Sequence, residues 1–109
     1  MQEKTVKIGN QEVKLQTSAY TPIRYAELFN ENLFQEMQDI ISYAQLTGAV
    51  PPEKIVTIYR LAYCMAEGAN PDIEPMDQWL RKFGVYDILE VLESIIDLWS
   101  DENNQQSTP

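Results

Sequence analysis

The residue types that most often carry enzyme chemistry are sparse in this sequence. Histidine is absent from all 109 residues, which removes the commonest general base and the commonest metal ligand. The single cysteine, Cys64, lies in the apolar run IYRLAYCMA, which favours a buried structural thiol over a reactive one. One cysteine without histidine cannot assemble a structural zinc site. We therefore expect no catalytic residues and no metal ligands.

The acidic residues do not match a calcium site or a pair of catalytic carboxylates. The segment DIEPMD, which starts at Asp72, resembles part of a calcium loop, but Pro75 interrupts it. Phe83 occupies the twelfth position, where such a loop needs a bidentate glutamate. Glu90 and Glu93 are expected on the solvent side of a helix rather than across a cleft. The sequence predicts a protein that is not an enzyme and that needs no cofactor.

The charge balance restricts the class of partner. Eight Lys and Arg face seventeen Asp and Glu, so the formal net charge is −9, and no basic residue follows Lys82. The electrostatic field of this negative charge repels phosphate backbones and disfavours nucleic acid as a partner. Two interpretations of the charge stay open. Either the negative charge serves only to keep the protein soluble, or it forms an acidic surface that attracts basic partners.

The length and the N-terminal sequence indicate one domain in the cytoplasm. A chain of 109 residues can bury one hydrophobic core without disulfides or metals. The lack of a disulfide framework is typical of a reducing compartment. The first ten residues, MQEKTVKIGN, lack the apolar core of a signal peptide. No stretch approaches the roughly 18 apolar residues of a membrane-spanning helix, so we expect no membrane partner.

The N-terminal part predicts a β-hairpin from Thr5 to Leu15. Apolar and polar residues alternate in two runs, and GNQ lies between the runs as a turn. Pairing Ile8 with Val13, and Val6 with Leu15, would place all four side chains on one face. Because an isolated hairpin is marginally stable in water, we expect this face to dock onto the helices that follow.

Capping residues and apolar spacing predict helices along the rest of the chain. They run from Thr21 as N-cap to Phe29, from Asn32 to Gly48, from about Pro52 to Gly68, from Pro75 to Gly84, and from Val85 to about Ser100. The third helix is apolar nearly all round, which predicts the buried centre of the fold. In the fourth, Trp79 shares a face with Phe83 and is expected to anchor the core.

The predicted architecture is mainly α: a compact bundle of four to five helices with a small N-terminal β-hairpin. We place the hairpin at about residues 4–16 and the helices at about 21–100, in a single globular domain spanning residues 1–100. Residues 101–109 contain no apolar side chain apart from proline and are predicted to form a disordered tail.

The final helix supplies the candidate residues for binding a partner. Its apolar stripe consists of Ile88, Leu89, Leu92, Ile95, Ile96 and Trp99. Val91 and Leu98 fall outside the centre of that stripe, which makes the apolar face wider than one helix face needs. Val91, Leu98 and Trp99 are therefore the predicted partner-binding residues. The alternative is that all three complete the core.

Two stretches resemble the tail assembly chaperones of long-tailed bacteriophages and prophages. The first, TPIRYAELFNENLFQEM, has Thr-Pro, then Arg24-Tyr25, then Phe29. The second, YRLAYCMAEGANPDIEPMDQWLRKF, has an aromatic-rich helix and then Trp79-Leu80 flanked by acidic residues. A short hairpin before four or five helices and a polar tail are also similar to that group. The resemblance covers about residues 4–99.

The resemblance implies a function in phage tail morphogenesis. Members of the family bind the tape measure protein in the host cytoplasm, keep it soluble, and help recruit the major tail protein around it. They are absent from the mature virion. A longer, frameshifted form often accompanies the short one, and this chain resembles the short form. The family has no residue with a defined chemical role to carry over, and whether this chain forms a homo-oligomer stays open.

A small acidic regulatory or anti-host protein of a phage or prophage is the alternative function. The sign of the charge is compatible with that class, although acidic mimics of nucleic acid usually carry denser acidic arrays. Both hypotheses predict a protein that acts by binding another protein.

Overall fold

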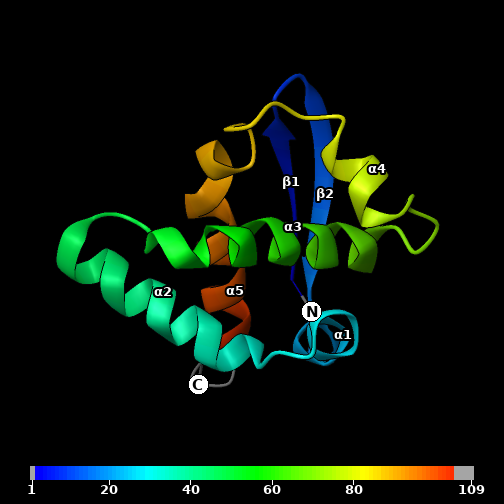
Figure 1. Ribbon diagram of the computed structural model, residues 1–109. Helices are drawn as coiled ribbons and strands as arrows, with labels where there is room; N and C mark the ends of the chain where they lie inside the picture. Colours follow the sequence, from blue (N-terminus) through cyan, green and yellow to red (C-terminus); the bar gives the residue numbers. More distant parts are fainter. Residues whose placement is uncertain (1, 105–109) are drawn as a thin grey trace.

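The computed structural model describes residues 2–104, with side chains from 2 to 100. Its strands and α-helices are β1 (Gln2–Ile8), β2 (Gln11–Thr17), α1 (Tyr20–Phe29), α2 (Leu33–Thr47), α3 (Ile55–Ala69), α4 (Met76–Leu80) and α5 (Leu92–Asn104). Short 3-10 helices, η1 (Pro52–Lys54) and η2 (Leu89–Val91), precede α3 and α5. α3 crosses the hairpin near its middle, and α1 and α2 lie at one end (Figure 1). The predicted mainly helical fold with an N-terminal hairpin is confirmed.

The hairpin forms with a register two residues away from the predicted one. Val6 lies opposite Val13, and Ile8 lies opposite Gln11. The predicted pairing of Ile8 with Val13 is wrong because the turn contains only two residues, of which the first is Gly9 with φ +61°. A positive φ at the first position is what a type II′ turn requires. Since side chains alternate with a period of two, this shift leaves the same residues on the buried face.

We expect Gly9→Ala to destabilise the protein more than Gly48→Ala does. Both glycines have positive φ, +61° and +76°, so each substitution costs about 1–2 kcal/mol in backbone strain. A Cβ at Gly48 meets no atom within 4 Å, whereas a Cβ at Gly9 would lie 2.6 Å from Oδ2 of Asp87. Urea denaturation of both variants measures the difference. Equal losses would show that the Asp87 contact contributes nothing.

The start of α1 differs from the predicted one. The helix begins at Tyr20, and Thr21 lies in its first turn rather than at the N-cap. The Thr21 hydroxyl still has a local role, because it accepts a hydrogen bond of 2.9 Å from the backbone N–H of Ser18. At α2 the prediction holds: the Asn32 side chain accepts a bond of 3.3 Å from the N–H of Gln35.

The last helix starts later and ends later than predicted. The segment from Val85 to Ile88 forms turns, and α5 begins only at Leu92. The carboxylate of Asp87 accepts a bond of 2.7 Å from the N–H of Gly84, which fixes the turn that precedes η2. At its other end α5 runs to Asn104 rather than stopping near Ser100. The predicted disorder of residues 105–109 lies outside the described residues.

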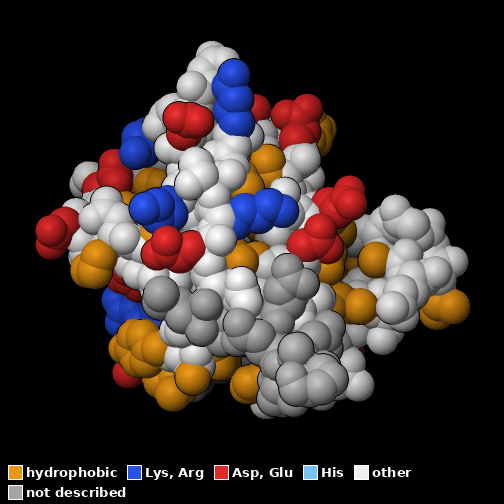
Figure 2. Space-filling view, turned by 180° about the vertical axis from the view of Figure 1, so that it is seen from behind, with side chains coloured by type: hydrophobic (Ala, Val, Ile, Leu, Met, Phe, Trp, Pro, Cys, Tyr) orange, Lys and Arg blue, Asp and Glu red, His pale blue; other side chains and the backbone are white. Residues whose placement is uncertain are grey.

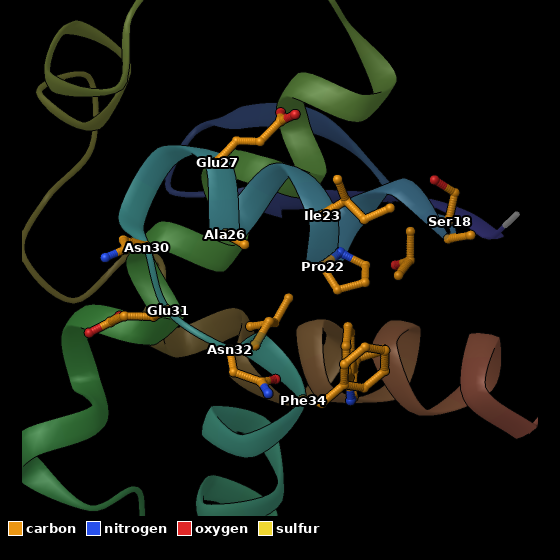
Figure 3. Close-up of a pocket in the computed structure, with 13 residues that line it drawn as sticks. Ser18, Pro22, Ile23, Ala26, Glu27, Asn30, Glu31, Asn32 and Phe34 are labelled. Carbon is orange, nitrogen blue, oxygen red and sulfur yellow. The ribbon is translucent and has the colours of Figure 1, made fainter.

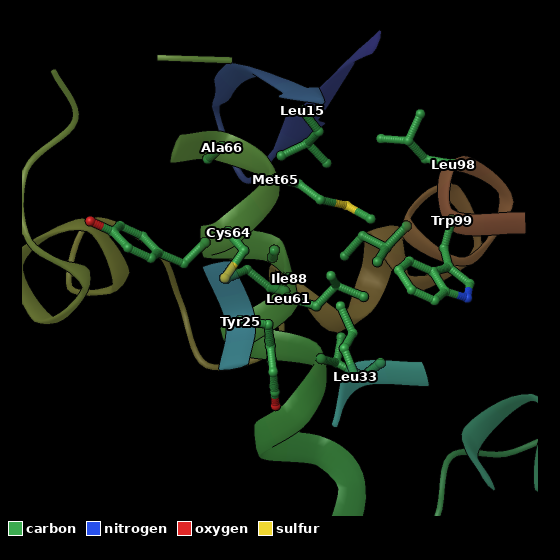
Figure 4. Packing of buried hydrophobic residues seen from close by; sticks show 14 of the residues in the cluster. Leu15, Tyr25, Leu33, Leu61, Cys64, Met65, Ala66, Ile88, Leu98 and Trp99 are labelled. Carbon is green, nitrogen blue, oxygen red and sulfur yellow. The ribbon is translucent and has the colours of Figure 1, made fainter. Parts of the chain in front are cut away.

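The core is built around α3, as its nearly continuous apolar sequence predicts. Ile58, Leu61, Ala62 and Met65 of this helix are fully buried. α3 packs along β2, and α5 contacts β1, so both helices cover the apolar face of the hairpin. Figure 4 shows side chains from α3, α5 and the hairpin meeting in one cluster. No helix in residues 2–104 is long and apolar enough to cross a membrane.

Candidate groove between α1 and α5

An open apolar groove of about 950 Å³ lies between α1 on one side and the start of α2 with α5 on the other. The residues that line it are Thr17, Ser18, Ala19, Pro22, Ile23, Ala26, Glu27, Asn30, Glu31, Asn32, Leu33, Phe34 and Trp99. Figure 3 shows the α1 side chains above Phe34, with the space between them. A cavity of this size is in the range of ligand and peptide sites in proteins.

The α1 wall is one face of a helix. Its lining residues include Ala19, Pro22, Ile23, Ala26 and Asn30, which stand at i, i+3, i+4, i+7 and i+11 and so lie in a row. The opposite face of α1 faces the core through Tyr25, which is fully buried. α1 therefore has two apolar faces, and the one with Ile23 faces the groove.

Two aromatic side chains form the other wall. The rings of Phe34 and Trp99 pack against each other with centroids 5.5 Å apart and an interplanar angle of 57°. Trp99 is 6% exposed, while Phe34 is 56% exposed, similar to the 54% of Ile23 on the facing wall. Exposing two large apolar side chains toward one groove is unfavourable in water and is typical of a site that a partner covers.

A buried hydroxyl lies in the wall at the end of β2. Thr17 is 1% exposed, and its Oγ1 has no hydrogen-bond partner among the described residues. Burying an unsatisfied hydroxyl costs free energy in the isolated protein. A complex that brings a polar atom to this position would relieve that cost.

The charged residues at the edge of the groove are acidic. Glu27 and Glu31 line it, and no lysine or arginine is among its lining residues. Glu31 pairs with Arg60 at 3.1 Å. Glu27 accepts a hydrogen bond of 2.7 Å from the Tyr20 hydroxyl and lies 3.5 Å from Arg24.

Arg24 is held more closely by a second carboxylate than by Glu27. It donates hydrogen bonds of 2.8 and 3.0 Å to Glu67 on α3, and this contact raises the pKa of Arg24 further above its usual value. The single positive charge of Arg24 is shared by two carboxylates. The group of Arg24, Glu27 and Glu67 therefore keeps an excess negative charge next to the groove.

The structure places the three predicted partner-binding residues in or against the core. Leu98 is only 3% exposed and Trp99 6%, so both belong to the core, and neither offers the exposed surface that was predicted. Figure 4 shows both side chains directed from α5 toward the cluster that contains Met65. Val91 is partly buried and packs against the same core. Of the three, Trp99 alone lines the groove.

Sequence reasoning missed the contribution of Ile23 and Phe34. Phe34 follows Leu33 at the start of α2 and is exposed because Leu33, Met37 and Ile40 already fill the buried face of that helix. For α1 a signal was present: Ile23 and Tyr25 are two residues apart, so one helix face cannot bury both. Such a pair indicates a second apolar face.

A smaller cavity of about 370 Å³ lies on the other side of α1 and includes Cys64. The thiol is buried, as predicted, and burial raises the pKa of Cys64 to about 12. At neutral pH it therefore stays protonated and unreactive. Among residues 2–104, no three His, Cys, Asp or Glu side chains converge in a way that could hold a metal ion.

Comparisons of this chain with protein-family models, with curated proteins and with solved structures found no match.

Proposed function

We propose that this protein is a tail assembly chaperone of a long-tailed bacteriophage or prophage. It binds the tape measure protein in the host cytoplasm, keeps that chain soluble and helps recruit the major tail protein. The client contacts the groove between α1 and α5 rather than the outer face of α5.

The apolar groove is the observation that carries this proposal. Its exposed walls, represented by Ile23 and Phe34, give a small protein an apolar surface that another protein can cover. A chaperone of a long helical client needs such a surface, because an amphipathic helix binds by burying its apolar face in a groove. The resemblance of residues 4–99 to the chaperone family supplies the identity of the client.

The charge of the protein supports the same function. A surface with free apolar side chains tends to self-associate, and a net charge of −9 opposes that association. In Figure 2 hydrophobic side chains gather over α1 and over the end of α2, while the hairpin face between them carries both acidic and basic residues. The most exposed large apolar side chains, Leu46, Val85 and Tyr86, lie outside the groove, so the net charge has to offset apolar surface in several places.

Co-expression with the tape measure protein tests the proposed function. We expect the client to accumulate in the soluble fraction only when this chain is present, because its apolar helices are otherwise free to aggregate. Fractionation of cell lysates, followed by co-purification of the two chains, measures the effect. An equal soluble yield of the client without this chain would contradict the proposal. An unrelated aggregation-prone helical protein, which should not be rescued, controls for a general effect.

A further inference from the structure

The shape of the groove indicates the secondary structure of what binds there. The α1 residues that line it include Ala19, Pro22 and Ala26, which are smaller than Ile23, the one large apolar side chain on this wall. Small side chains let two helix axes approach to the roughly 8–10 Å that helix packing requires. Phe34 then stands on the opposite wall and can contact the far side of an inserted helix.

The charge at the edge indicates the composition of that helix. Glu27 belongs to a group of one arginine and two carboxylates, and its side chain is 50% exposed. Its carboxylate can accept further hydrogen bonds. In Figure 3 the Glu27 carboxylate is directed to the side of α1 away from Phe34, at the outer edge of the groove. A long lysine or arginine side chain at the outer edge of a bound helix can therefore reach Glu27 around α1 while its charged end stays in solvent.

We propose that the groove accepts one amphipathic helix of the client, which packs an apolar row against Ile23 and Phe34 and places a lysine or arginine beside Glu27. This inference rests on the proposed function, because the client supplies the helix. Beyond that function, it specifies that the binding segment is helical and basic.

Two other occupants fit the groove less well. A second copy of this chain would bring its own charge of −9 and a second acidic edge, so the two copies would repel each other. Residues 105–109, with the sequence QQSTP, carry no large apolar side chain that could fill the space. A basic amphipathic helix from another protein satisfies both the apolar walls and the charge.

Two synthetic helical peptides with the same row of leucines test the inference, one flanked by lysines and the other by glutamates. Isothermal titration calorimetry with the full chain should show the lysine peptide binding at least about tenfold more tightly, and more weakly as salt rises. Equal affinities for the two peptides would overturn the charge preference.

Two pairs of variants locate the binding. Ala26→Trp fills the groove and should abolish binding of the lysine peptide, while Ala49→Trp, at an exposed site that does not line the groove, should leave binding unchanged. Glu27→Gln should weaken binding about twofold to fivefold, and the exposed, distant Glu53→Gln should not. Unchanged binding by Ala26→Trp would overturn the groove as the site. Equal effects of the two glutamine variants would overturn the Glu27 contact, because the net charge alone would then explain the preference.

The peptide assay contains no phage component, so its outcome is separate from that of the co-expression assay. If the tape measure protein is not rescued but the lysine peptide binds in the groove, the proposed client is wrong and the helix-binding groove stands. If the client is rescued equally by the wild type and by Ala26→Trp, the function stands and the groove inference fails. Sedimentation of the free protein completes the test: a dimer that Ala26→Trp dissociates would assign the groove to a second copy.

Discussion

Leu98→Asp is expected to unfold the free protein. The Leu98 side chain is 3% exposed, so the substitution removes buried apolar surface and places a carboxylate in the core. The first effect alone costs about 2–5 kcal/mol for a buried leucine, and an unpaired buried charge adds several more. That sum is comparable with the whole stability of a small domain. Circular dichroism and urea denaturation measure the loss.

Leu98→Met is the matched control, because it keeps the volume and adds no charge. It should cost less than about 1.5 kcal/mol. A Leu98→Asp variant that stays folded with wild-type stability would mean that Leu98 is accessible, and it would restore the outer face of α5 as a candidate surface.

Trp79→Ala is expected to cost about 3–5 kcal/mol of the free energy of unfolding. Trp79 is 2% exposed, and its ring packs edge-to-face against Tyr63 at 5.6 Å and Phe83 at 5.0 Å between centroids. The contact with Tyr63 joins α4 to α3, so removing the indole opens a cavity between the two helices. Urea denaturation checks the loss. Trp79→Phe, which keeps an aromatic ring, should lose clearly less, and a loss below about 1 kcal/mol for Trp79→Ala would show that the site collapses around the smaller side chain.

The elements that the sequence predicted best are those with long periodic patterns and strong caps. α2 is such a case, since Asn32 caps its start and Gly48 ends it in the left-handed conformation. The start of α5 could not be predicted in the same way. It depends on the hydrogen bond from the Tyr59 hydroxyl to the carbonyl of Val85, which joins residues far apart in the chain.

The candidate groove could not be predicted from the sequence. The acidic, histidine-free composition predicts a protein-binding function, which stays a prediction, and the wide apolar stripe on α5 indicated residues that the structure buries. The stripe is wide because α5 packs on the hairpin and its Trp99 also packs against Phe34 of α2, so Leu98 and Trp99 are both buried. Whether an extra apolar residue is exposed depends on how many neighbours a helix has, and this is set by the tertiary arrangement.

The most direct test of the central claim compares Ile23→Lys with Val56→Lys in the client co-expression assay. Both residues are helical, β-branched and similarly exposed, at 54% and 57%, but only Ile23 lines the groove. Both variants should stay within about 0.5 kcal/mol of wild-type stability, since neither side chain is buried. We predict that Ile23→Lys leaves the tape measure protein as insoluble as it is without a chaperone, while Val56→Lys rescues it like the wild type. Full rescue by Ile23→Lys, or its loss with Val56→Lys alone, would contradict binding in the groove.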